Sequence, residues 1–236
     1  MIAIFPQLAA CAKSRDLEKL AVLVRTQYGF TVPKLDADAL LQATGIDVES
    51  LELDCAGNLL VQDEKGQFAI IAVLPQKLHD EVRRFRLAHL LGHFLLHVQH
   101  KIADGTFKGH GFQEVECPYA RYVSGKAPAL QSREEVDAEL AADEFAAALL
   151  MPKSLVEAAL AKGATPDALA SFFGCPVALV QRRLAYLGVL KQDVTKGMAR
   201  LREIASQLEH TRKPASGDKA APATGKSRSA RRPAVK

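Results

Sequence analysis

Two histidines and one glutamate have the types and the spacing of a zinc site. His89 and His93 are four residues apart in the segment 80–100, where apolar residues recur at helical intervals. On a helix, this spacing places both imidazoles on one face. Glu139 lies in a second helical segment, and catalytic zinc commonly takes two imidazoles, one carboxylate and a water. The pattern therefore predicts that His89, His93 and Glu139 bind one zinc ion.

The residues around these ligands indicate two closely packed helices. Gly92 costs a helix about 1 kcal/mol relative to alanine, so a neighbouring backbone is expected to approach closely there. The second helix is rich in small residues, which would allow such an approach: Ala141, Ala142, Ala146 and Ala147. Asp143 lies one turn beyond Glu139 and could orient a ligand histidine by a hydrogen bond to the ring nitrogen that does not bind the metal. The alternative is that Asp143 has no role at the metal site.

Other candidate ligands are interpreted as structural or solvent-facing. His97 lies one turn beyond His93, but successive four-residue steps drift by about 40° around a helix, so a shared metal is not expected. His100 and His110 are expected in solvent or in a loop, and Cys117 as a buried or idle thiol. Three arginines could contact an acidic substrate segment, although a solvated helix face is the default: Arg83, Arg84 and Arg86.

The remaining pattern favours an α+β fold with a small antiparallel sheet. Helices are expected over residues 16–28, 36–43, 80–100, 132–150, 153–162, 166–173, 177–187 and 191–210, and strands over 51–53, 59–62 and 68–73. Ser132 and Glu135 have the spacing of a capping box at the start of the helix that carries Glu139. The stretch 102–132 shows little periodicity and is expected to be irregular.

Composition divides the chain into three parts. Residues 1–152 are predicted to form the metal-binding domain, 153–210 a helical subdomain, and 211–236 a disordered basic tail. The residues from 212 onward hold eight Lys or Arg and one acid, a net charge of +7, which leaves −3 for the rest of a chain whose total is +4. The body is therefore a poor candidate for a nucleic-acid binder, while the tail could give weak, salt-sensitive attraction to nucleic acid.

Four widely spaced cysteines, without a CxxC pair, predict reduced thiols in a cytoplasmic protein: Cys11, Cys55, Cys117 and Cys175. No apolar run is long enough to span a bilayer, so no membrane association is expected. The segment 168–188 has the cadence of a helix-turn-helix. Its second helix is mostly apolar, but it also carries Arg182 and Arg183, so DNA reading stays open as a minor alternative.

Two long motifs resemble the ImmA/IrrE family of zinc metallopeptidases. They are RFRLAHLLGHFLLH at residues 84–97 and ELAADEFAAALLMP at 139–152, and the resemblance extends from about residue 16 to about 190. It implies a zincin-like fold with a gluzincin-type site, in which His89, His93 and Glu139 hold zinc. The family is known for cleaving helix-turn-helix repressors, which switches on stress-response or mobile-element genes. The resemblance thus implies a repressor-like protein partner.

One position departs from the family motif, HExxH. Its glutamate is the general base that takes a proton from the zinc-bound water, and Leu90 stands at that position here. An aliphatic side chain accepts no proton, and loss of a general base typically costs about 100- to 10,000-fold in rate. Three hypotheses follow: a zinc peptidase with reduced chemistry, a non-enzymatic zinc-binding regulator, and a DNA-associated regulator.

Overall fold

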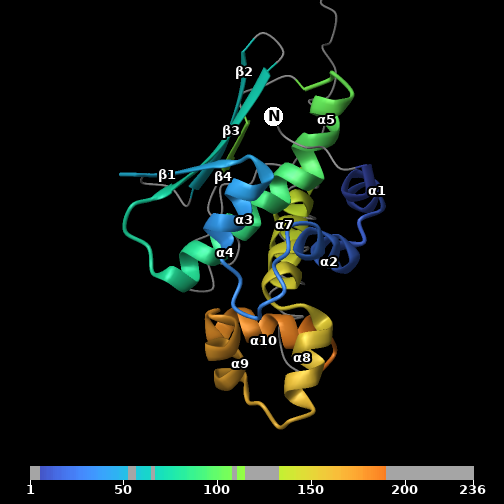
Figure 1. The fold of residues 1–236 in the computed structure, drawn as a ribbon, viewed down its shortest axis with the longest axis vertical. Coiled ribbons are helices and arrows are strands. Elements are labelled where there is room, and N and C mark those ends of the chain that lie inside the picture. The colour runs from blue at the N-terminus through green and yellow to red at the C-terminus, as the bar shows by residue number, and fades with distance from the viewer. Residues whose placement is uncertain (1–5, 53–56, 65–66, 108–110, 115–132, 190–236) are drawn as a thin grey trace, which may run out of the picture.

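The computed structural model describes residues 6–52, 57–64, 67–107, 111–114 and 133–189 (Figure 1). Its helices are α1 (Pro6–Ser14), α2 (Leu17–Gln27), α3 (Ala37–Thr44), α4 (Asp80–His93), α5 (Gln99–Ala103), α7 (Arg133–Leu150), α8 (Lys153–Leu160), α9 (Pro166–Phe173) and α10 (Val177–Tyr186). Its strands are β1 (Asp47–Leu51), β2 (Gly57–Glu64), β3 (Gln67–Pro75) and β4 (Gly111–Glu114). The predicted α+β class is confirmed. The Ser132 cap, the helix over 191–210 and the basic tail lie outside the described residues.

The sheet has four strands in the order β1-β3-β2-β4 and is mixed. β2 and β3 form the expected antiparallel hairpin, with Glu64 opposite Gln67. β1 pairs with β3 in parallel, so the prediction of a purely antiparallel sheet is wrong. Turn residues predict a hairpin between neighbours in sequence, but they do not determine the side on which an earlier strand joins. β4 lies in the stretch predicted to be irregular. Its sequence did not reveal it, because the strand forms by pairing with the free edge of β2.

Local signals placed most helix boundaries within a few residues. The carboxylate of Asp16 accepts a hydrogen bond from the backbone N–H of Lys19 and begins α2, and Asp36 caps α3 through Ala39 in the same way. The Thr165 side chain accepts from the backbone N–H of Ala168 at the start of α9, with Pro166 at the first helical position. α1 was not among the predicted helices.

The segment 80–100 is helical throughout, as predicted, but its helix type changes along the way. α4 ends at His93, a π-helical turn covers Phe94–Val98, and α5 follows. A π turn inserts one residue into the helical repeat and is frequent at functional sites. The turn directly follows the two histidines predicted as ligands, and it contains His97.

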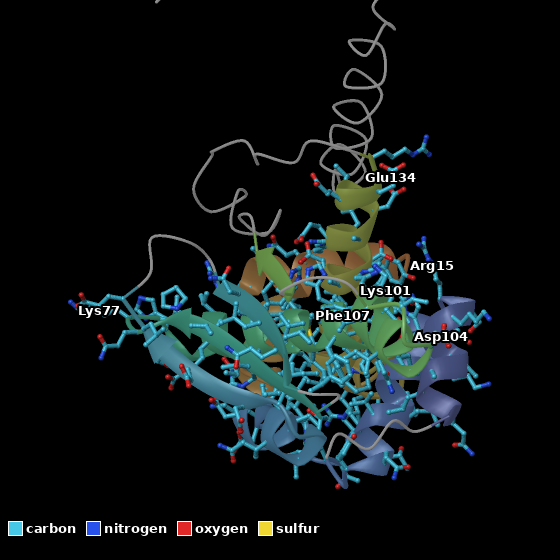
Figure 2. All side chains as sticks on the ribbon, turned by 90° about the horizontal axis from the view of Figure 1, so that it is seen from above. Arg15, Lys77, Lys101, Asp104, Phe107 and Glu134 are labelled. Carbon is cyan, nitrogen blue, oxygen red and sulfur yellow. The ribbon has the colours of Figure 1, made fainter. Side chains whose placement is uncertain are left out.

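One cluster of buried apolar side chains connects the elements, from Leu8 in α1 to Leu184 in α10. α4 and α7 lie between the sheet on one side and α1 and α2 on the other, and α8 to α10 lie at one end of α7 (Figure 1). Charged side chains such as Lys77, Asp104 and Glu134 point outward at the rim (Figure 2). Among the described helices, none has the length and apolarity that crossing a membrane requires.

The α9–α10 pair has the expected helix-turn-helix cadence, with Gly174 in a left-handed conformation at the turn. The φ of 62° at residue 174 favours glycine, and a Cβ there would also meet the flexible side-chain ends of Arg84 and Lys34, at 2.7 and 2.8 Å, which would have to move. The Arg84 guanidinium donates a hydrogen bond to the Gly174 carbonyl and ties α4 to this turn. Whether residues 153–210 form a separate subdomain stays a prediction.

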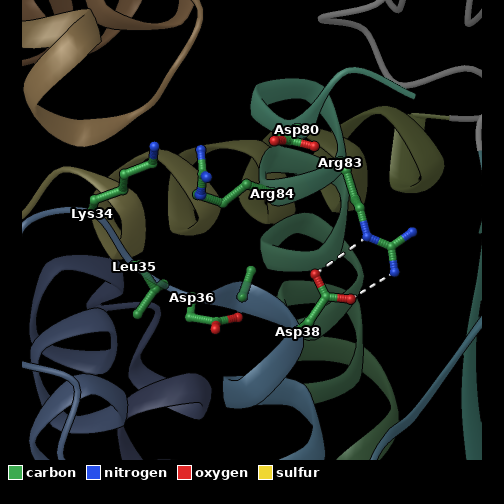
Figure 3. A pocket seen from close by; sticks show the side chains of 8 residues that line it. Lys34, Leu35, Asp36, Asp38, Asp80, Arg83 and Arg84 are labelled. Atoms are coloured by element: carbon green, nitrogen blue, oxygen red, sulfur yellow. Dashed lines mark hydrogen bonds and ion pairs between the residues drawn. The ribbon is translucent and has the colours of Figure 1, made fainter.

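Beside this contact, a polar hollow of about 330 Å³ lies between α3 and the first turns of α4 (Figure 3). On its far wall the Arg83 guanidinium donates two hydrogen bonds to the carboxylate of Asp38, at 2.6 and 3.2 Å. Arg83 therefore has a structural partner and is not simply a solvated residue of the helix face.

α4 and α7 pack so closely that residue 92 must be small. A Cβ added at Gly92 would lie 3.0 Å from Cδ1 of Phe145 and 3.2 Å from both Cα and O of Ala142. These separations are tighter than ordinary van der Waals contact. The expected close approach of a neighbouring backbone is thus confirmed.

We expect Gly92→Ala to destabilise the protein, although alanine is the better helix former. Overpacking costs about 1–3 kcal/mol, and the gain in helix propensity is about 1 kcal/mol, so a net loss of about 1 kcal/mol should appear in urea unfolding. Ser171→Ala, at an exposed position of α9, is the control that gains propensity without a packing cost. A Gly92→Ala variant more stable than the parent would contradict the close packing.

Candidate metal centre

Three side chains from α4 and α7 converge near Gly92, where these two helices pack tightly. His89 Nε2 lies 2.9 Å from His93 Nε2, and each of these nitrogens lies 3.2 Å from one carboxylate oxygen of Glu139. Among the described residues, these three form the group whose possible ligand atoms all lie within 4.8 Å of one another. All three side chains are buried. The structure therefore brings together the three residues that the sequence predicted as ligands.

Asp143 determines which nitrogen of His89 faces this centre. Its Oδ1 lies 2.9 Å from His89 Nδ1. An ionised carboxylate only accepts hydrogen bonds, so Nδ1 must carry a proton, and in the neutral imidazole it is then Nε2 that has the free lone pair on the side of Glu139 and His93. This is the tautomer that a metal-binding histidine requires.

The carboxylates stay ionised despite their burial. Burial alone would raise the pKa of Glu139, but hydrogen bonds and charges from His89 and His93 outweigh it and lower the pKa of this carboxyl well below its usual range. For Asp143, burial is likewise outweighed, first by the charge of Arg182 and then by the hydrogen bond to His89, so its pKa is lowered too. Burial lowers the pKa of His93, which favours the neutral imidazole.

These protonation states suit a divalent cation. Without a metal, the contacts with His89 and His93 hold the Glu139 carboxylate ionised; with a metal bound, the neutral imidazoles would present their Nε2 lone pairs, and Glu139 its carboxylate, to one cation. Oε2 of Glu139 is buried and, among the described residues, accepts no hydrogen bond of good geometry, although His89 Nε2 lies 3.2 Å away. A metal would satisfy this oxygen and both Nε2 atoms at once. The donor set is thus able to hold a metal ion.

Leu90 follows His89 on α4 and belongs to the hydrophobic core. Its side chain is 0 % exposed. Asp143 is no substitute base, because one of its oxygens contacts His89 and the other contacts Arg182. Glu135, a second acid on the same helix, is exposed at the first turn of α7.

Other predicted positions lie away from the trio. The His97 ring is centred 5.5 Å from that of His93 but does not belong to the ligand group found among the described residues, and His100 is exposed. His110 and Cys117 lie outside the described residues. Cys11 and Cys175 are buried free thiols, and burial raises the pKa of Cys175 to about 12.

Arg182 is the residue at this centre that the sequence did not reveal. From α10, its Nη1 donates to Oδ2 of Asp143 at 2.8 Å, across 39 residues of chain. Its neighbour Arg183 also turns inward, to Glu18 and to the carbonyl of Met151. Both arginines that had suggested DNA reading therefore bind acids of this protein. No local pattern could have distinguished these inward arginines from solvated ones.

The class of protein follows from the fold and from comparison with known families. The family model Peptidase_M78, described as the IrrE N-terminal-like domain, matches residues 41–185, a span that contains the trio, Asp143 and Arg182. This match covers more than half of the chain, so the protein belongs to that family, in agreement with the resemblance seen in the sequence. No curated protein matches the chain.

We expect His97 to make the metal-free protein less stable in acid. Burial first, and then the nearby charge of His93, lower the pKa of His97 to about 4 from 6.5. Between these values the unfolded chain binds a proton that the folded chain does not, so stability is lost as the pH falls from 6.5 towards 4. At pH 4.5 this loss is about 2 kcal/mol.

Urea unfolding at pH 7.5 and 4.5, with EDTA present, measures this effect. His97→Gln should reduce the difference between the two pH values by about that amount, whereas the exposed His100→Gln should not. An unchanged pH difference in His97→Gln would show that His97 is accessible to protons in the folded state.

Proposed function

We propose that this chain is a gene-regulatory protein built on the ImmA/IrrE zinc metallopeptidase scaffold, with impaired peptidase activity and a helix-turn-helix repressor as its protein partner. The observation that carries the proposal is the convergence of His89, His93 and Glu139 beside a buried Leu90. The family match supports the metallopeptidase scaffold. The repressor partner, and a role in stress response, rest on what the family does.

Zinc is the metal that this donor set favours. Two imidazole nitrogens and one carboxylate oxygen leave a fourth tetrahedral position open, as in catalytic zinc sites. Zinc supplies Lewis acidity, which polarises a peptide carbonyl and makes water more acidic. The protein's part is to hold the ligands: Asp143 fixes the His89 tautomer, and the packing at Gly92 sets the separation of α4 and α7.

Impaired hydrolysis follows from the chemistry of residue 90. Proton transfer from the attacking water to the leaving amine requires a side chain that accepts and then returns a proton. Leu90 does neither, and Asp143 is held by His89 and Arg182. The scaffold would then bind its partner without cleaving it efficiently. Regulation by binding, rather than by proteolysis, is the activity that these residues support best.

We expect about one zinc per chain in purified protein by elemental analysis. His89→Ala should lose it, because a two-ligand site binds zinc far more weakly. His100→Ala, an exposed histidine on α5, should keep it and serves as the matched control. A parent protein without metal, even after incubation with Zn²⁺, would contradict the zinc site.

We further expect Leu90→Glu to gain peptidase activity against at least one of a panel of purified helix-turn-helix repressors, followed by gel and mass spectrometry. The parent should be about 100- to 10,000-fold slower. Leu90→Gln has the same shape without the base and should remain inactive, as should Leu90→Glu combined with His89→Ala. Because Leu90 is buried, each variant is first checked for folding by circular dichroism. Cleavage by the parent at the rate of Leu90→Glu would refute impaired catalysis.

A further inference from the structure

Arg182 and Asp143 form a chain of contacts that leads from α10 to the metal centre. Arg182 Nη1 donates to Oδ2 of Asp143 at 2.8 Å, and Oδ1 of Asp143 accepts from His89 Nδ1 at 2.9 Å. The Asp143 side chain is 0 % exposed and that of Arg182 is 12 % exposed. The contacts are thus largely shielded from solvent, where charged hydrogen bonds are stronger than at a surface.

The two contacts use different oxygens of one carboxylate, and this geometry holds its plane. A carboxylate with a single partner can rotate about its last bond, whereas one held through both oxygens cannot rotate without breaking a contact. The orientation of Asp143 fixes the Nδ1–H of His89 and, through it, the direction of the Nε2 lone pair. Arg182 therefore acts on a predicted ligand atom without touching it.

We propose that Arg182 is a positioning residue of the metal centre, and that it couples the docking of α10 to metal affinity. The inference rests on the proposed metal site and goes beyond it by assigning a role to the C-terminal helical segment. α10 is not only packed on α7; it supplies the cation that keeps Asp143 oriented. Displacement of α10 would weaken metal binding, and metal binding would hold α10 in place, because coupling between two sites is reciprocal.

The adjacent arginine provides a matched comparison within the same helix. Arg183 is buried and bonded to Glu18 and to the Met151 carbonyl, at 2.8 and 3.1 Å. Neither of these partners belongs to the metal group found among the described residues. A purely structural role for inward-facing arginines of α10 would make Arg182 and Arg183 equivalent for metal affinity. The positioning role makes them different.

The first test is the Kd for Zn²⁺ at pH 7.5, measured by competition with a chromophoric chelator. Arg182→Gln should raise the Kd about tenfold or more, as loss of the groups that orient metal ligands does. Arg182→Lys should raise it less, because the charge is kept. Arg183→Gln should raise the Kd clearly less than Arg182→Gln, because its own contacts do not reach a metal ligand and it can act only by loosening α10.

A double-mutant cycle shows whether Arg182 acts through Asp143. In an Asp143→Asn background, Arg182→Gln should have no further effect on the Kd, because the carboxylate that it positions is gone. Additive effects of the two substitutions would overturn the inference, and so would a parental Kd in Arg182→Gln. A parent with no measurable affinity for Zn²⁺ would instead overturn the proposed metal site, and this inference with it.

Hydrogen exchange of the unmodified protein tests the reciprocal effect without any variant. Adding Zn²⁺ should slow amide exchange in α10 more than in α8, an internal reference that lies in the same C-terminal segment. If Zn²⁺ slowed amide exchange equally in both helices, metal binding would not stabilise α10 specifically, and the coupling would be refuted.

Discussion

The close packing of α4 against α7 is the constraint on which the rest of the site depends. Gly92 allows the backbone of Ala142 to approach so closely that an added Cβ would lie within 3.2 Å of it. On the same stretch of these helices, His89 and His93 meet Glu139. A side chain at residue 92 would separate the helices and with them the ligands. Gly92 lowers the helix propensity of α4, but its small size allows His89 and His93 of α4 to meet Glu139 of α7.

Charge is the second constraint, because this contact buries two carboxylates. Glu139 and Asp143 both stay ionised, while His93 favours its neutral form. Arg182 supplies one positive charge, which leaves the interior with one excess negative charge when both histidines are neutral. A divalent cation between the histidines and Glu139 would reverse that imbalance. The electrostatics of the chain and the chemistry of its donor atoms thus favour the same occupant.

Leu90 connects the packing of the domain to its chemistry. A carboxylate at residue 90 would have to be accommodated beside the core, where an unpaired charge is costly. The leucine instead contributes apolar contacts to the cluster that holds α4 in place. At residue 90 an apolar side chain that packs in the core thus stands in place of a proton acceptor. This is consistent with a scaffold that keeps its metal ligands and acts by binding a protein partner. The general base can thus be lost while the metal ligands stay in place, because residue 90 packs in the core whereas the ligands contact one another.

Local spacing in the sequence paired His89 with His93, while Glu139 was predicted from a second helical segment and from the family resemblance. His89 and His93 share a helix face at four-residue spacing, and apolar periodicity predicted most element boundaries within a few residues. Only the tertiary structure decided the parallel pairing of β1, the π turn after His93 and the inward direction of Arg182. The physical reason is the range of the interactions: helical periodicity and capping act over about four residues. The contact between Arg182 and Asp143, by contrast, spans 39 residues and exists only once α10 has docked on α7.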